Sequence, residues 1–147
     1  MATKPTKSSK LWNVFLWIGQ LVLAGMFLMA GYLKTFVPIP ELSQVIPMAG
    51  EMPGLTRFIG VSELAGGIGL LLPAGVRILP QLTIAAAYAL GVVMILAILF
   101  HIQRGEYDAL PTTFVLGTIA FFVGWGRTSK APIRARSSQS TVSNQTA

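Results

Sequence analysis

The stretch FIGVSELAGGIGLLLP, residues 58–73, is the part of this chain that best indicates its fold. It is apolar and rich in glycine, as helices that cross membranes often are, yet it contains Glu63 in its interior. An unpaired charge in hydrocarbon costs on the order of several kcal/mol. We therefore expect Glu63 either to be protonated or to face a cationic partner that another helix supplies.

The composition of the whole chain is that of an integral membrane protein. Of its 147 residues, 53% are hydrophobic and 11% are charged, and the mean hydropathy is +0.67. A soluble domain carries about 25% charged residues, so a chain this short and apolar has too little polar surface for a water-soluble globule. The chain has no cysteine, which excludes disulfides, cysteine-ligated clusters and thiolate catalysis. The predicted fold class is all-α integral membrane.

Four apolar segments predict a bundle of four transmembrane helices, because a spanning helix needs roughly 20 residues. The segments cover about residues 11–33, 58–79, 81–102 and 111–125. They form one predicted membrane domain, residues 11–126, with a long outward loop at 34–57. Residues 1–10 are expected to form a disordered basic tail, and 127–147 a basic and then Ser/Thr-rich tail. Such polar segments bury too little apolar surface to become ordered.

The distribution of basic residues predicts the orientation of the bundle. The net charge is +6, and the 11 Lys and Arg residues divide unequally between the two sides of the predicted bundle. The richer side carries Lys4, Lys7, Lys10, Arg77, Arg127, Lys130, Arg134 and Arg136; the other carries Lys34, Arg57 and Arg104. By the positive-inside rule, both termini are predicted to be cytoplasmic in a bacterial inner (plasma) membrane. The expected partners are membrane lipids and other membrane subunits or further copies of the chain, and not nucleic acid.

Small residues predict close packing between the helices. In lipid, helices associate where small side chains let their backbones approach each other. Six glycines in the second and fourth segments recur at helical spacing and are interpreted as packing positions: Gly60, Gly66, Gly67, Gly69, Gly117 and Gly124.

Polar side chains from four segments converge at one depth near the outward face. With alternating helix directions, Lys34 ends the first segment and His101 ends the third, while Thr112 and Thr113 begin the fourth. Glu63 lies six residues after Arg57, which places it roughly 9 Å below the start of its helix. We expect Glu63 to meet Lys34 or His101 there. On the inward side, Arg77 and the tails are interpreted as ordinary anchors.

Two interpretations of this polar group stay open: a structural ion pair that fixes helix register, or a pocket for a quinone head group, a proton or a small anion. No metal site and no covalently bound cofactor are expected. The chain has a single histidine, and it contains no GxGxxG, P-loop, HExxH or EF-hand motif. With so few polar groups, the chain is not expected to catalyse a complete redox reaction alone, although a bound quinone is compatible with the pocket.

Several motifs together resemble the DoxX family of small four-span membrane proteins. They are AGYLK (30–34), FIGVSELAGGIGLLLP (58–73) followed by Arg77, MILAILFH (94–101) and FFVGWGR (121–127). The resemblance covers about residues 11–127. It implies a four-helix membrane bundle, and it implies that Lys34, Glu63, Arg77 and His101 match recurring polar positions of the family.

The family is named for its similarity to membrane subunits of thiosulfate:quinone oxidoreductase, so the resemblance implies a redox-associated, quinone-linked membrane component. One departure concerns the start of the fourth helix, where Pro111, Thr112 and Thr113 stand and relatives often carry Asn or another polar residue. Two other hypotheses remain. The chain is a non-catalytic structural or assembly subunit of a larger membrane complex, or, as the least favoured alternative, a small-solute transporter.

Overall fold

The computed structural model describes residues 7–133 and is all-helical over that range apart from short connections. The four long helices are α1 (Lys7–Phe36), α4 (Pro53–Val76), α5 (Gln81–Arg104) and α6 (Leu110–Ser129). All four are long and apolar enough to cross a membrane. Two short helices, α2 (Ile39–Val45) and α3 (Pro47–Glu51), follow α1, and a single 3₁₀ turn, η1 (Tyr107–Ala109), precedes α6. The predicted all-α architecture with four spanning helices is confirmed.

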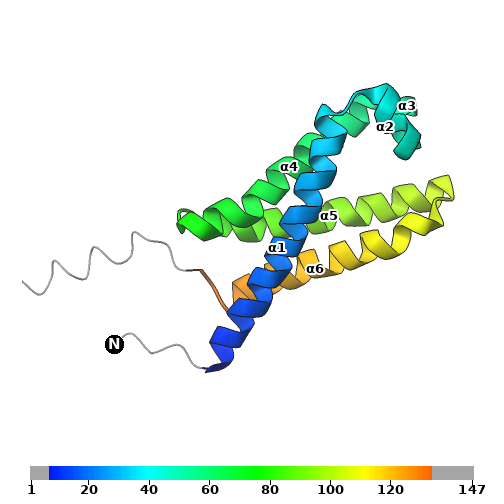
Figure 1. Cartoon of the computed structure of the whole chain (residues 1–147). Coiled ribbons are helices and arrows are strands. Elements are labelled where there is room, and N and C mark those ends of the chain that lie inside the picture. Colours follow the sequence, from blue (N-terminus) through cyan, green and yellow to red (C-terminus); the bar gives the residue numbers. More distant parts are fainter. Residues whose placement is uncertain (1–6, 134–147) are drawn as a thin grey trace, which may run out of the picture.

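The helices pack in sequence-adjacent, antiparallel pairs, α1 with α4 and α5 with α6, and further contacts join α4 to α5 and α1 to α6. In Figure 1 the two pairs diverge toward the end that carries α2 and α3. We call this the Lys34 end. The opposite end, where α1 begins and α6 finishes, is the Arg127 end.

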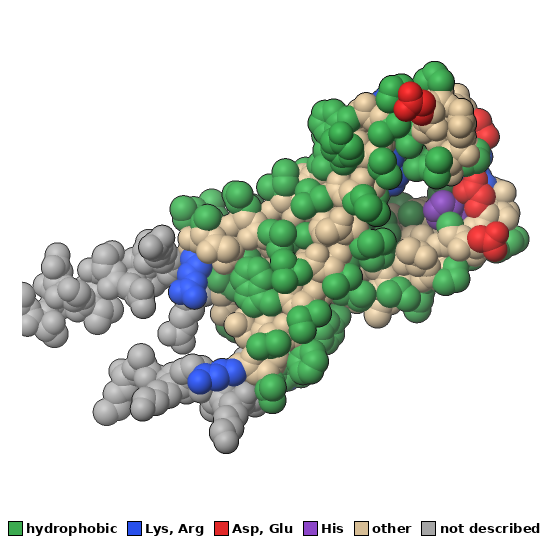
Figure 2. Space-filling view, viewed as in Figure 1, with side chains coloured by type: hydrophobic (Ala, Val, Ile, Leu, Met, Phe, Trp, Pro, Cys, Tyr) green, Lys and Arg blue, Asp and Glu red, His purple; other side chains and the backbone are tan. Residues whose placement is uncertain are grey.

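The buried core lies where the two pairs cross. It is built from large aliphatic and aromatic side chains of all four long helices, including Leu23, Phe27, Leu70, Leu90 and Val123. Many other large apolar side chains are exposed along the whole length of the bundle, as the green surface in Figure 2 shows. An apolar surface of this extent is what hydrocarbon, and not water, solvates.

Helix ends differ from the sequence-based boundaries by several residues. Helix α1 already begins at Lys7, inside the predicted tail 1–10, and α6 continues to Ser129, past the predicted boundary at 126. Helix α4 begins at Pro53 and not at residue 58, because a proline in the first turn lacks only an N–H that would have no partner there. It ends at Val76, before the predicted limit of 79. The remaining parts of both predicted tails, 1–6 and 134–147, lie outside the described residues.

The loop predicted at 34–57 is not a single irregular segment. Pro40 lies in the first turn of α2 with Glu41 beside it, an arrangement that the helix dipole favours. Helix α3 ends at Glu51, and one residue separates it from α4. The two short helices bring Glu51 toward the end of α5 (Figure 1).

Candidate functional site

The Lys34 end contains a buried ion pair between two helices. Lys34 lies in the last turn of α1, and its Nζ donates to Glu63 Oε1 at a distance of 2.6 Å. The side chains are 17% and 4% exposed, respectively. The partner that Glu63 requires is therefore Lys34, which supplies a cation inside the bundle.

Two glycines allow α1 and α4 to approach closely enough for this pair to form. A Cβ atom on Gly60 would lie 2.7 Å from Lys34 Cβ and 2.6 Å from Thr35 Oγ1. A Cβ atom on Gly31 would lie 2.8 Å from the Gly60 carbonyl oxygen. All three distances are shorter than real Cβ contacts, so any side chain here would push the helices apart and lengthen the distance between Lys34 and Glu63.

Arg57 supports the same corner from the second turn of α4. Its Nη1 and Nη2 donate to the carbonyl oxygens of Lys34 and Val37, each at 2.7 Å. These carbonyls end α1, where a cation also interacts favourably with the helix dipole. Sequence reasoning assigned Arg57 no such role, because a hydrogen bond to backbone carbonyls leaves no pattern in the side chains.

Two buried polar atoms beside the pair have no protein partner. Over residues 7–133, Glu63 Oε2 and Thr35 Oγ1 are both buried and form no hydrogen bond within the chain. Buried polar groups are nearly always hydrogen-bonded in folded proteins. A carboxylate oxygen, a hydroxyl and the Lys34 ammonium thus offer one acceptor and two donor groups to a small polar ligand.

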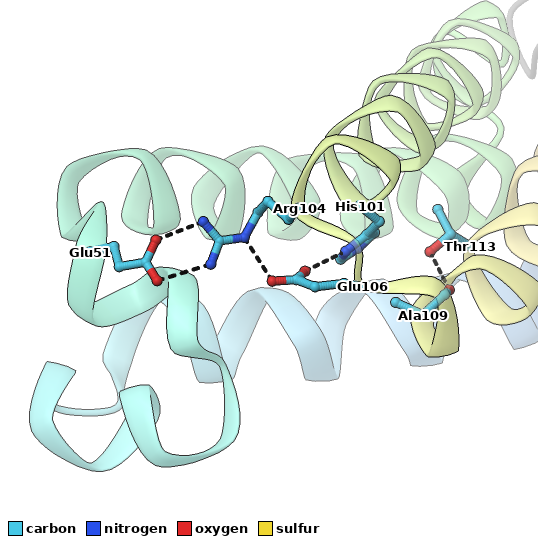
Figure 3. Close-up of polar contacts among 6 residues, drawn as sticks. All are labelled: Glu51, His101, Arg104, Glu106, Ala109 and Thr113. Atoms are coloured by element: carbon cyan, nitrogen blue, oxygen red, sulfur yellow. Dashed lines mark hydrogen bonds and ion pairs between the residues drawn. The ribbon is translucent and has the colours of Figure 1, made fainter.

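A second polar network lies at the same end and joins α3 to α5 (Figure 3). Arg104 donates to both carboxylate oxygens of Glu51, at 2.6 and 2.9 Å, and through Nε to Glu106 at 2.7 Å. The hydrogen bonds from Arg104 hold the pKa of Glu51 and of Glu106 below their usual range, and His101 contributes to the effect on Glu106. Both carboxyl groups are therefore ionised at neutral pH.

Of the two cations expected near Glu63, Lys34 forms the pair and His101 lies elsewhere. Its Nδ1 lies 2.8 Å from Glu106 Oε2, and no contact with Glu63 occurs among the described residues. The reason is local. Gly105 adopts a left-handed conformation (φ 71°), and the Glu106 N–H then donates to the His101 carbonyl, so that the chain folds back over the end of α5. The turn thus places the carboxylate of Glu106, five residues along the chain, next to the imidazole of His101.

The threonines at the start of α6 do not line the ion pair either. Thr113 is buried, but its hydroxyl donates to the carbonyl of Ala109, the last residue of η1, at 2.8 Å (Figure 3). Thr112 is exposed. Figure 2 shows that the surface is hollowed between the two helix pairs at this end, with His101 visible at the margin of the hollow.

The Arg127 end holds a third polar cluster that sequence reasoning missed. Arg127, assigned to a polar tail, is 1% exposed and lies in α6. Its Nε donates to Gln20 Oε1 and its Nη1 to Asn13 Oδ1, and Gln20 in turn donates to the Leu70 carbonyl. The cluster joins α1, α4 and α6. The interpretation of this side as bearing only ordinary anchors was wrong; the available signal was Gln20, an amide within an apolar segment.

The six glycines predicted to pack lie at helix contacts. Gly60 and Gly67 face α1, while Gly66 and Gly69 of α4 and Gly117 and Gly124 of α6 face side chains of α5. Of the residues that the structure describes, no three His, Cys, Asp or Glu side chains are grouped so that they would hold a metal ion.

Comparison with known proteins gives one match. Residues 18–123 match the model of the DoxX-like family, a range that covers most of the chain and includes Lys34, Glu63 and His101 but not Arg127. The comparisons with curated proteins and with solved structures gave no significant match.

Proposed function

The chain belongs to the DoxX-like family, and on that premise we propose that it is a quinone-linked membrane component that binds a quinone head group beside the Lys34–Glu63 pair. One observation carries the proposal: a buried ion pair beside which Glu63 Oε2 and Thr35 Oγ1 have no hydrogen-bond partner in the part of the chain that the structure describes. The carbonyl oxygens of a quinone accept hydrogen bonds, and Lys34 and Thr35 would donate them.

Glu63 is the proposed proton carrier at this site. Reduction of a quinone to a quinol consumes electrons and protons in equal number, and a carboxyl group beside the ring carbonyl supplies or removes a proton. Ionisable residues inside membranes commonly mark such proton pathways. We assign binding and proton transfer to this chain, and electron transfer to a redox partner subunit.

The proposed orientation follows from the basic residues at the Arg127 end. Both termini would lie in the cytoplasm, and the quinone site would face the outer half of a bacterial inner membrane. A long-chain quinone suits the opening between the helix pairs. Its head group would bind the polar side chains there, and its isoprenoid chain would stay in the hydrocarbon of the membrane.

The test is quinone binding to the purified protein in nanodiscs, by titration with a short-chain ubiquinone and a menaquinone analogue. We expect Glu63→Gln to weaken binding about tenfold or more, because a neutral amide holds the Lys34 ammonium less firmly than the carboxylate does, and that ammonium is a proposed donor to the quinone. Glu41→Gln is the matched control: Glu41 is an exposed carboxylate on α2, and its loss should leave the affinity unchanged. Wild-type affinity in a folded Glu63→Gln protein would contradict the proposal.

A second candidate function is that of a non-catalytic subunit in a larger membrane complex. It is favoured by the divergence of the two helix pairs, which are bridged at their open end by the exposed Arg104–Glu51 contact (Figure 3). A partner helix would fill such an opening. Gly25→Leu is the appropriate probe, because Gly25 is exposed and has no atom within 4 Å of an added Cβ. Loss of co-purifying subunits in that variant supports this function, whereas migration of the wild type as a lone protein on native gels in mild detergent contradicts it.

A further inference from the structure

The Arg127 end contains a pocket at the turn between α4 and α5. Its volume is about 610 Å³, and it is lined by residues of that turn, of the start of α5 and of the end of α6. The polar lining includes Arg77, Arg127 and Thr128, and apolar walls are formed by side chains such as Ile84 and Ile133. The exposed Arg77 and the buried Arg127 thus both line one partly apolar pocket, at the opposite end of the bundle from the proposed quinone site.

Within residues 7–133, the charge of Arg127 is buried without a counter-ion. Its protein acceptors are neutral: the side-chain oxygens of Gln20 and Asn13 and the carbonyl of Ala131. Its Nη2 is buried and has no partner within the described part of the chain. A buried charge that lacks an opposite charge is strongly destabilising, so a bound anion would offset this cost.

No carboxylate side chain of this sequence is placed to supply that anion. The sequence contains five acidic residues, and all belong to the Lys34 end or to the helix segment beneath it. They are Glu41, Glu51, Glu63, Glu106 and Asp108. Three of them are already paired with Lys34 or Arg104. Among the described residues, Arg127 therefore has no carboxylate partner.

The turn that forms one wall of the pocket has a strained backbone. Arg77 and Leu79 both have positive φ, 56° and 50°, although neither is glycine. Each such residue costs roughly 1–2 kcal/mol, and strain of this kind concentrates at functional sites. The turn places Arg77 at the pocket together with Gln81, the first residue of α5. The amino end of α5 attracts anions through its dipole, while the N–H groups of Leu82 and Thr83 already donate to the carbonyls of Leu79 and Pro80.

From these observations we propose that the pocket binds a phosphate group. Arginine forks match the paired oxygens of a phosphate, and the start of α5 adds a third source of positive potential. The apolar walls favour the phosphate of an anionic membrane lipid, whose glycerol and acyl carbons would lie against Ile84 and Ile133. Inorganic phosphate offers the same anionic chemistry without those carbons.

The experiment uses the full chain, delipidated in a neutral detergent, and measures binding by native mass spectrometry and by the shift in thermal unfolding. The probes are phosphatidylglycerol, inorganic phosphate and zwitterionic phosphatidylcholine. The test variant is Arg77→Gln, because Arg77 is exposed and takes no part in the Arg127 hydrogen bonds. The matched control is Lys130→Gln, a cation at the same end that packs over Trp12 and Trp125 outside the pocket.

We expect the wild type to retain phosphatidylglycerol, Arg77→Gln to bind it about tenfold more weakly and Lys130→Gln to bind it as the wild type does. Stabilisation by phosphatidylglycerol alone identifies a lipid phosphate, and equal stabilisation by inorganic phosphate identifies the free anion; both support the proposal. No binding of either probe, or equal loss in the two variants, would overturn it. Because the quinone titration involves the other end of the bundle, the two proposals fail independently.

Discussion

Replacement of Lys34 by Met should destabilise the bundle more than replacement of Glu63 by Gln. Methionine keeps the apolar stem and volume of lysine, but it leaves the Glu63 carboxylate, 4% exposed, without its cation. Removal of one partner from a buried pair costs about 3–5 kcal/mol. Since the Lys34 side chain is 17% exposed and water screens its charge in part, we expect a loss near the lower limit, about 3 kcal/mol.

Glu63→Gln should cost less, about 1–2 kcal/mol, because the amide oxygen still accepts a hydrogen bond from Lys34 and no buried charge is left without a partner. In the double variant, residue 63 is a neutral amide and not a carboxylate. Loss of the Lys34 cation therefore costs much less there than it does in the single variant Lys34→Met. The double variant should therefore lose at most about 1 kcal/mol more than Glu63→Gln, which gives a coupling free energy of about 2–3 kcal/mol.

The assay is reversible unfolding in mixed micelles with an increasing fraction of SDS, followed by far-UV circular dichroism. Free energies of unfolding are compared across the four members of the double-mutant cycle, and equal slopes show that the variants unfold the same structure. A loss below about 1 kcal/mol for Lys34→Met, or additive effects of the two substitutions, would refute the argument that the pair is buried and mutually dependent.

Two further predictions concern the helix contacts. Gly60→Ala should lower the free energy of unfolding by about 1–3 kcal/mol, since the new Cβ would meet the backbone of α1. Gly25→Ala is the control: its Cβ would have no atom within 4 Å, so this substitution should be neutral or stabilise the fold by up to about 1 kcal/mol. Similar effects of both substitutions in the same SDS titration would contradict this prediction. Because Arg104 holds the pKa of Glu51 low, their contact stabilises the fold above the usual pKa of Glu51 and is lost as the pH falls through the lowered value. The protection factors of the α3 amides, which correct for the pH dependence of intrinsic exchange, should fall in that acidic range, and Glu51→Gln should show low protection at every pH; unchanged protection of the wild type through the same range would count against the role of the pair.

The sequence by itself determined the fold class and the number of spanning helices. Those conclusions depend only on how much apolar side chain each segment carries and on the length needed to cross hydrocarbon, both of which are local properties. The requirement that Glu63 have a partner followed from the same reasoning, because a lone charge in that environment costs too much. Lys34 was among the possible partners for the simple reason that it ends the preceding apolar segment.

The partner of each polar group depends on the tertiary structure and could not be assigned without it. His101 turns to Glu106 because of a left-handed glycine, and Arg104 reaches Glu51 because two short helices fold back across the bundle. The sequence pattern predicts that Arg127 belongs to a polar tail. Its burial depends on where α1 and α4 lie and not on its neighbours in the chain. Pairing among polar groups is a matter of distances between separate helices, and hydropathy and spacing along one chain do not encode those distances directly.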